Sequence, residues 1–334
     1  MNDRPLRLRL VVPANVDTPT GGNAYDLALA HALRAAGDAV EVVRCDPADL
    51  EATLREPWDG PTLVDGLLAC PQPAAVAAAQ VGVLVHMSLA LETGLPRTRA
   101  AELDRLEGEA LRAARWVVTT SHWSARHVTE HHGVGGVAVA PPGVEPAPVS
   151  AGSDPPLLVQ LASLLPNKNQ LGVVAALAQL SDLPWQARLA GPTDRDPVYA
   201  LKVRLAVRDA GLSDRVRVTG TMAREAAWAG ADLALLPSRV ETFGMVVTEA
   251  LARGVPAVVG EGGAVEALGS TPTGEVPGAV VPPGDPFALA SVLRRWLTDR
   301  AYRDVVRRAA LARRSTLDRW DETAKLVRTA LMPG

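Results

Sequence analysis

A chain of 334 residues is long enough for two domains of roughly 150 residues each. Its residues are 48% hydrophobic but only 4% aromatic, so its cores are expected to be aliphatic. The net charge of −3 provides no global attraction to nucleic acid or to an anionic membrane surface. The abundance of Ala, Val, Pro and Arg is typical of a GC-rich, bacterial-like genome. Against that background the three lysines, Lys168, Lys202 and Lys325, stand out.

The sequence predicts a soluble protein of the cytoplasm. Cys45 and Cys70 are too few to cross-link a chain of this size, which favours a reducing compartment. The stretch before Pro13 is too short in apolar residues for a signal peptide, and no run of about 18 apolar residues indicates an integral membrane segment. Peripheral membrane contact stays open. The helix predicted over residues 97–114 mixes acidic and basic residues, which favours a soluble partner over a membrane lipid.

The first half of the chain alternates between short apolar runs and amphipathic stretches. Tyr25, Leu29 and Leu33 repeat at helical spacing, and Gly37 ends that pattern before the next apolar run. Such alternation indicates parallel βαβ units. The predicted strands are Arg7–Pro13, Ala39–Val43, Thr62–Leu68, Val81–Met87, Trp116–Ser121 and Val137–Ala140. The predicted helices are Asn23–Ala36, Arg97–Ala114 and Trp123–His131.

A proline-rich stretch from Pro141 to Pro156 separates the two halves, and because such spacers are semi-rigid we place the domain boundary there. The alternation then restarts. The strands predicted after it are Leu157–Ala162, Gln186–Ala190, Val216–Thr219, Leu233–Leu236, Ala257–Val259 and Ala279–Val281. The predicted parts are residues 1–148, residues 149–315 and a C-terminal helix in residues 316–334. This organisation predicts two α/β domains with parallel sheets, which bind ligands beyond the carboxyl ends of their strands.

The most informative stretch runs from Ala231 to Pro256. It predicts a buried strand, a loop that carries Glu241, and a helix from about Phe243 to Arg253. The first-turn N–H groups of that helix have no intrahelical partners and can bind a phosphate. These groups belong to Phe243, Gly244, Met245 and Val246. Gly244 lets an anion approach the backbone, and Glu249, about two turns in, can accept hydrogen bonds from sugar hydroxyls. For Glu241 alone, simple helix capping is an equal alternative.

This stretch resembles the E-x₇-E signature of the family 4 retaining glycosyltransferases. The matching positions are the Pro-Ser before the loop, Glu241-x-Phe-Gly, Glu249 followed by Ala-Leu-Ala, a later Gly-x-Pro, and residues 262–266. The resemblance implies the GT-B fold, in which two Rossmann-like domains face each other across a cleft. It further implies that residues 1–148 bind the acceptor, that residues 149–315 bind the nucleotide sugar, and that the C-terminal helix returns to the N-terminal domain.

Residues 161–168 resemble the family's G-R-L-x-x-x-K turn, whose Arg and Lys bind the donor diphosphate. Lys168 is retained, whereas Ala162 and Ser163 replace the Gly and Arg. Ser163 therefore occupies a donor-binding position without its charge. Electrostatic stabilisation of the leaving diphosphate, an expected catalytic contribution, is thus reduced unless another arginine supplies the missing positive charge. The candidates are Arg188, Arg195 and Arg239.

Two residues of the first half resemble further family features. Gly22, in a Gly-Gly pair before the first helix, matches the glycine loop that approaches the donor phosphate or the acceptor, although turns need glycine in any case. His86 ends a predicted strand, where family members often have a histidine near the donor sugar. A histidine buried in the core is the alternative.

The resemblance implies transfer of a hexose-type sugar from a nucleotide diphosphate sugar to a hydroxyl acceptor, with retention at the anomeric carbon. His86, Glu241 and Lys168 are the implied catalytic residues, and the donor is a co-substrate, with no cofactor and no metal implied. A weakly active or non-catalytic nucleotide-sugar-binding protein and an epimerase or phosphorylase of the same fold are alternatives. A remote one is a zinc metalloprotease, from the H-x-x-E-H spelling of residues 127–131. Residues 194–196 spell D-x-D, where helix capping is favoured over metal binding.

Overall fold

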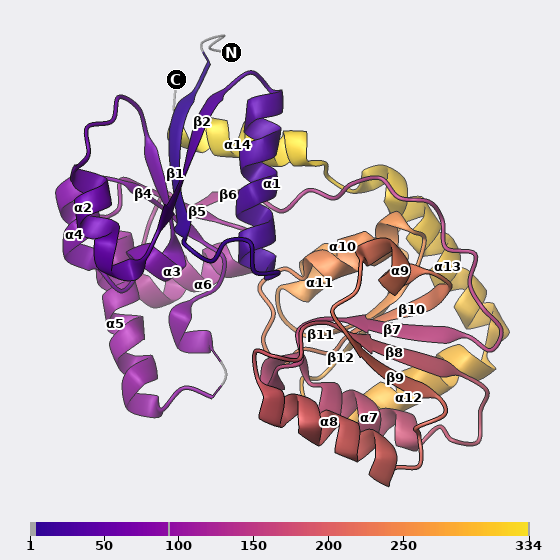
Figure 1. Cartoon of the computed structure of the whole chain (residues 1–334). Helices are drawn as coiled ribbons and strands as arrows, with labels where there is room; N and C mark the ends of the chain where they lie inside the picture. The colour runs from indigo at the N-terminus through magenta and orange to yellow at the C-terminus, as the bar shows by residue number, and fades with distance from the viewer. Residues whose placement is uncertain (1–4, 93, 333–334) are drawn as a thin grey trace. The chain divides into compact units, whose positions relative to one another are not determined.

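The computed structural model describes residues 5–92 and 94–332. The chain divides into two compact units (Figure 1). Unit 1 comprises residues 1–143 and 318–334, and unit 2 comprises residues 144–317. The boundaries predicted at residues 148 and 315 thus lie a few residues from those of the structure.

Unit 1 is built on a six-stranded parallel sheet in the order β2-β1-β3-β4-β5-β6. The strands β1, β3 and β4 are almost entirely buried, as expected where helices cover both faces of a parallel sheet. The strands are β1 (Arg7–Pro13), β2 (Ala39–Cys45), β3 (Thr62–Asp65), β4 (Gly82–Val85), β5 (Trp116–Thr119) and β6 (Ala138–Val139). The helices are α1 (Gly21–Ala35), α2 (Leu50–Arg55), α3 (Gly66–Ala69), α4 (Pro73–Ala79), α5 (Arg97–Ala113), α6 (His122–His132) and α14 (Trp320–Leu331).

The C-terminal helix α14 belongs to unit 1, which confirms the predicted return of the chain (Figure 1). Its Trp320 packs edge-on against Tyr25 of α1, with ring centroids 5.4 Å apart. The Thr323 hydroxyl donates to the carbonyl of Pro141 over 2.7 Å, and Arg328 pairs with the buried Asp38. The buried apolar residues of α14, Ala324, Val327 and Leu331, lie at helical spacing and form the face that packs on the rest of unit 1.

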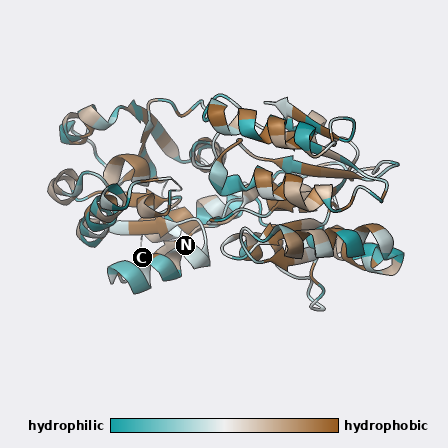
Figure 2. Ribbon diagram, turned by 90° about the horizontal axis from the view of Figure 1, so that it is seen from below, coloured by the Kyte–Doolittle hydropathy of each residue, from teal (hydrophilic) through white to brown (hydrophobic). Residues whose placement is uncertain are grey.

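Unit 2 repeats the design with a six-stranded parallel sheet in the order β12-β11-β10-β7-β8-β9. Strands of both units are mostly hydrophobic, while the helices mix hydrophobic and hydrophilic positions (Figure 2). The strands are β7 (Leu157–Leu161), β8 (Gln186–Ala190), β9 (Val216–Gly220), β10 (Ala231–Leu236), β11 (Ala257–Gly260) and β12 (Gly278–Val281). The helices are α7 (Gln170–Ala178), α8 (Pro197–Asp209), α9 (Arg224–Trp228), α10 (Met245–Ala252), α11 (Ala264–Leu268), α12 (Pro286–Thr298) and α13 (Arg300–Arg313).

Each sheet has a point where the strand order reverses, between β1 and β3 in unit 1 and between β7 and β10 in unit 2. Ligands of open α/β sheets bind at such switch points, beyond the carboxyl ends of the strands. The segments that follow these four strands are therefore where a site is expected in each unit.

Three predicted elements need correction. The strand predicted over Thr62–Leu68 ends at Asp65, because the Asp65 carboxylate accepts the N–H of Leu67 over 2.6 Å and begins α3. The first helix begins at Gly21, two residues early, because Thr20 caps it through the N–H of Asn23. The helix predicted from Phe243 begins at Met245.

The late start of α10 has a backbone cause. Gly244 has a φ of +86°, a left-handed conformation that cannot be the first turn of a helix. Glu249 therefore lies just over one turn into α10, not two. Among the helices of residues 5–92 and 94–332, none has the length and apolar character needed to cross a bilayer.

Candidate functional site

Lys168 and Glu241 form an ion pair at the switch point of unit 2. Lys168 ends the 3₁₀ turn after β7, and Glu241 lies in the loop after β10. The Lys168 Nζ atom lies 2.7 Å from the Glu241 Oε2 atom, and the Ser238 hydroxyl donates to the same oxygen over 3.3 Å. Both side chains are only partly exposed, at 23% and 12%. Two residues predicted from different motifs thus meet at one point.

The turn that carries Lys168 is held from three sides. The buried Gln160 amide donates to the Lys168 carbonyl over 2.7 Å. Asn169 takes a left-handed conformation with a φ of +59°, and its amide donates to the carbonyl of Pro237 over 3.1 Å. The Arg239 N–H donates to the Asn167 carbonyl over 2.7 Å. These contacts join the loop after β7 to the loop after β10, which fixes Lys168 relative to Glu241.

The N-terminus of α10 presents backbone donors beside this pair. Within the described part of the chain, the N–H groups of Met245 and Val246 have no acceptor, whereas that of Val247 donates to the Gly244 carbonyl. Phe243 is buried in the core of unit 2, so its side chain has a packing role. A glycine is required at position 244 because of the left-handed backbone there and because a Cβ would lie 2.8 Å from Leu236. These two reasons add to the predicted one, that a glycine lets an anion approach the backbone.

Glu249 is buried on the inner face of α10 and has two partners from α9. Arg224 lies 2.8 Å from its Oε1 atom, and the Trp228 indole donates to its Oε2 atom over 3.4 Å. Burial raises the pKa of Glu249, and the charge of Arg224 opposes that rise. The Arg224 side chain is 54% exposed, whereas that of Glu249 is 10% exposed.

Ser163 lies in the loop after β7, with its carbonyl accepting from the Gln170 amide over 2.9 Å. Of the three arginines proposed to compensate for it, Arg188 is already bound, since its guanidinium donates to backbone carbonyls of residues 226, 227 and 229. Arg195 is exposed in the loop before α8. Arg239 is exposed and adjoins the Lys168 turn through its backbone. Arg239 is thus the candidate whose backbone contacts the Lys168 turn, while its guanidinium lies beside Gly284.

His86 is the centre of a buried polar cluster at the switch point of unit 1. It directly follows β4, and its Nε2 atom lies 2.9 Å from Asp26 of α1 and 3.6 Å from Asp65 at the end of β3. The Tyr25 ring packs edge-on against the imidazole at 5.1 Å. Gly22 makes room for it, because a Cβ at Gly22 would lie 3.1 Å from the His86 Cδ2 atom. Neither aspartate was predicted from the sequence.

The charges of this cluster are strongly coupled. Burial by itself lowers the pKa of His86, but the ion pair and hydrogen bond with Asp26, helped by Asp65, raise it to about 9. Burial raises the pKa of Asp65 to about 7, although the charge of His86 opposes that rise. His86 is therefore an imidazolium at neutral pH rather than a base.

The two rival motifs have structural explanations. His127 and His131 lie on one face of α6 with stacked rings 5.2 Å apart, but His131 is bound to Asp104 of α5 over 2.7 Å. Glu130, the general base of a metalloprotease in that motif, is exposed. In the D-x-D segment, the Asp196 carboxylate accepts the N–H of Tyr199 over 2.9 Å and caps α8, as predicted.

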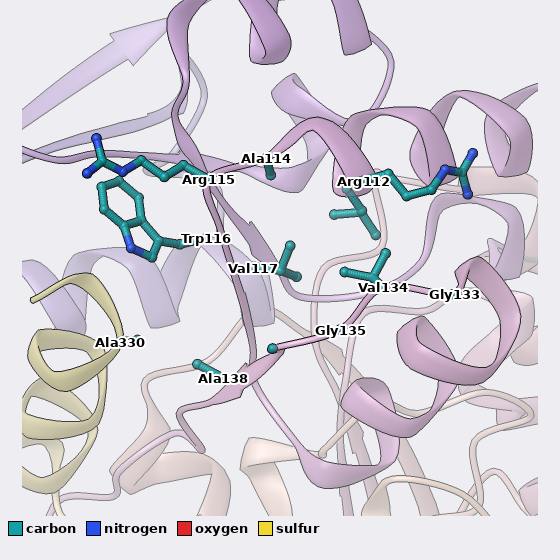
Figure 3. Close-up of a pocket in the computed structure, with 12 residues that line it drawn as sticks. Arg112, Ala114, Arg115, Trp116, Val117, Gly133, Val134, Gly135, Ala138 and Ala330 are labelled. Carbon is teal, nitrogen blue, oxygen red and sulfur yellow. The ribbon is translucent and has the colours of Figure 1, made fainter. Parts of the chain in front are cut away.

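A pocket of about 310 Å³ lies elsewhere in unit 1 (Figure 3). It is lined by residues at the amino end of β5, by the loop around Gly135, and by Ala330 of α14. Arg115 lies over the ring of Trp116 at 4.4 Å. His86 follows the carboxyl end of the neighbouring parallel strand β4, so this pocket lies at the opposite ends of the strands from His86. None of the predicted site residues lines it.

Comparison with known proteins identifies the family. The profile of the family described as "Glycosyl transferases group 1" matches residues 143–313, which include the Lys168 turn and the loop and helix from Glu241 to Glu249. The chain belongs to this family. Its match begins at the boundary of unit 2 and covers most of that unit.

Curated relatives carry the name D-inositol 3-phosphate glycosyltransferase. The protein of Kineococcus radiotolerans is 30% identical over 66% of this chain and 57% of its own length. That of Nocardiopsis dassonvillei is 27% identical over 75% of this chain and 65% of its own length. The chain thus spans between about half and two thirds of the length of these relatives.

Solved structures share the fold of the whole chain. Sucrose-phosphate synthase from Thermosynechococcus elongatus matches with a TM-score of 0.78 over 96% of this chain and 97% of its own, at 20% identity. Anabaena HepE in complex with UDP and glucose matches with a TM-score of 0.76 over 98% and 99%, at 18% identity. These likenesses, with the two parallel sheets, confirm the predicted GT-B fold of two Rossmann-like domains.

Proposed function

We propose that this protein is a retaining glycosyltransferase that moves a hexose-type sugar from a nucleotide diphosphate sugar to a hydroxyl group of a small soluble acceptor. Family membership supports sugar transfer. The observation that carries the proposal is the Lys168–Glu241 pair at the switch point of unit 2, beside the two unpaired N–H groups of α10. One ammonium group and two backbone donors suit a diphosphate, and a carboxylate suits sugar hydroxyls.

The proposed donor site assigns a role to each group. Lys168 and the N–H groups of Met245 and Val246 bind the diphosphate, Glu249 binds the ribose hydroxyls, and Glu241 binds the donor sugar. Ser163 lies at the diphosphate position and contributes a neutral contact. Gly22 and His86 of unit 1 act on the donor sugar or its phosphate. The donor is a co-substrate, and the proposal includes no metal and no further cofactor.

The proposed chemistry follows from these charges. The bond between the anomeric carbon and the diphosphate oxygen breaks, and negative charge grows on the leaving diphosphate. Lys168 and the α10 donors stabilise that charge, which is the largest expected catalytic contribution. The acceptor hydroxyl attacks from the same face, so the configuration is retained. Its proton passes to the departing phosphate, because Glu241 is committed to Lys168 and His86 is already charged.

Nucleotide sugars are expected to stabilise the protein against heat. A ligand at 100 times its dissociation constant adds about 2.7 kcal/mol to the free energy of unfolding. The measurement is a thermal-shift screen of UDP-, GDP- and ADP-hexoses, with AMP and free glucose as controls. If no nucleotide or nucleotide sugar moved the melting temperature, the donor assignment would be abandoned.

A nucleotide-sugar-binding protein with little or no turnover is the second candidate. The observation that favours it is Ser163, a neutral side chain where the family pattern has an arginine. The two candidates differ in one result. A transferase releases free nucleotide from the stabilising donor only when an acceptor such as an inositol phosphate is added, and a binding protein does not. An epimerase would change the donor without any acceptor.

The two glycines of the first helix provide a matched pair of variants. A Cβ at Gly22 would press on His86, which Asp26 and Tyr25 hold in place, whereas a Cβ at Gly21 would meet nothing within 4 Å. We expect Gly22→Ala to lower the transfer rate about tenfold, since small displacements of catalytic groups are costly. Gly21→Ala should stay close to the wild-type rate. Equal rates for the two variants would show that the position of His86 is unimportant.

A further inference from the structure

Two buried carboxyl groups beside His86 each have one oxygen that makes no hydrogen bond within the described part of the chain. Asp26 is 0% and Asp65 is 1% exposed. The Oδ1 atom of Asp26 accepts from His86, and the Oδ1 atom of Asp65 accepts the N–H of Leu67. Within residues 5–92 and 94–332, the Oδ2 atom of each carboxyl group is buried without a hydrogen-bond partner, and that of Asp65 lies 3.6 Å from the His86 Nε2 atom. An ionised oxygen in that position is costly, so a proton is required there.

The two carboxyl groups are close enough to share that proton. One carboxylate oxygen of each aspartate and a ring nitrogen of His86 all lie within 4.8 Å of one another. Two buried like charges at this distance cannot both persist, as in other carboxyl pairs that hold one proton between them. One imidazolium, one carboxylate and one carboxylic acid together form a neutral buried unit.

The geometry also decides which His86 nitrogen faces a ligand. The Nε2–H is committed to Asp26 at 2.9 Å. The Cδ2 edge of the ring faces Gly22, and the Tyr25 ring lies edge-on at 5.1 Å. Within residues 5–92 and 94–332 the Nδ1 atom has no hydrogen-bond partner, while the His86 side chain is 15% exposed. An imidazolium in this setting has one free donor, its Nδ1–H.

We propose that Asp26 and Asp65 share one proton and hold His86 as an imidazolium whose Nδ1–H donates to an oxygen of the sugar donor. The oxygen is a sugar hydroxyl or a phosphate oxygen, and this part rests on the proposed function. Asp26 is the positioning residue, because it fixes the ring and supplies its counter-charge. Asp65 contributes the protonated carboxyl group, so that no second negative charge lies beside that of Asp26. The other titratable groups packed here are Tyr25 and Cys70, and burial raises the pKa of both.

The test is a pair of amide substitutions read by activity and by NMR. In Asp26→Asn the counter-charge is lost, and His86 is expected to return toward an ordinary pKa near 6.5. Its protonated fraction at pH 8 then falls about 30-fold, whereas at pH 6 it changes less than twofold. The transfer rate should follow the same pattern. Asp65→Asn imitates the protonated acid and leaves the Asp26 counter-charge in place, so the His86 ring should still be charged at pH 8 in this variant.

The imidazole ¹⁵N signal of His86, assigned by its absence in His86→Gln, gives a readout that needs no turnover. We expect the wild-type ring to stay charged up to about pH 9 and the Asp26→Asn ring to lose its charge below pH 8. Asp17→Asn, which removes an exposed partner of Arg44, is the matched control and should leave both readouts unchanged. Circular dichroism verifies the fold of each variant.

Three results would overturn the proposal. They are a wild-type His86 that titrates near pH 6.5, an Asp26→Asn variant with an unchanged titration, and stoichiometric Zn²⁺ binding that Asp26→Asn abolishes. The last would replace the shared proton by a metal ion. If the NMR results hold but no variant and no wild-type protein transfers sugar, the proposed function fails and the proton-sharing pair stands.

Discussion

Replacing Lys168 by alanine is expected to lower kcat for sugar transfer by about 10²–10³-fold, the usual cost of removing one preorganised group that stabilises transition-state charge. The effect is large because Ser163 leaves the diphosphate with one side-chain cation fewer than the family pattern provides. The Lys168 ammonium is also prepositioned, held by Glu241 and by a turn fixed through Gln160 and Asn169. It therefore needs little reorganisation when charge develops.

The matched control is Lys202→Ala, which removes an exposed lysine from α8 of the same unit. It should retain wild-type kcat. Donor affinity, measured by the thermal shift of the UDP- or GDP-hexose that binds, is expected to fall less than kcat, since the leaving group carries more charge in the transition state than in the bound donor. A Lys168→Ala variant whose kcat stays within a factor of three would contradict the role of Lys168 at the leaving group.

The sequence pattern predicted the fold because that information is local. Short, mainly apolar runs, interrupted by amphipathic stretches, define every strand of β7 to β12 within about two residues. Lys168 and Glu241 could also be predicted from local sequence, because each belongs to a short motif that can be found without knowledge of the fold. Their contact, however, depends on the adjacency of β7 and β10, and those strands are separated by two others along the chain.

The buried aspartates needed long-range information. Asp26 directly follows Tyr25 and lies three residues before Leu29, on the face of α1 that the apolar repeat buries, and an aspartate on that face is the available signal. Asp65 looked like part of a strand that ran on to Leu68, because its capping of α3 depends on a backbone turn. Similarly, the sequence pattern does not indicate the left-handed φ of Gly244, so it predicts that α10 begins at Phe243. Such backbone turns and buried side chains depend on contacts with other segments of the chain.

Raising the pH from 6.5 to 8.5 is expected to destabilise unit 1 by about 2 kcal/mol through His86 alone. The folded-state pKa of His86 is about 9, above its unfolded value of about 6.5. A raised pKa contributes stability that is complete below the unfolded value and is lost as the pH approaches the folded one. Asp65 acts in the same direction, since its pKa is raised to about 7. The window stops at pH 8.5 because Cys70 and Tyr25, whose pKa values burial raises, add losses of their own above it.

The measurement is calorimetric unfolding of the wild type and of His86→Gln at pH 6.5, 7.5 and 8.5. Groups that titrate equally in both proteins cancel in the difference between the two melting temperatures, which isolates His86 together with the carboxyl groups coupled to it. For a unit of this size about 2 kcal/mol corresponds to roughly 4–8 °C, so the wild-type advantage should shrink by that amount across the window. His31→Gln, at an exposed histidine of α1, should keep the wild-type slope. A difference that is flat with pH would mean that His86 is not held in its charged form, and the neutral cluster of His86, Asp26 and Asp65 would have to be given up.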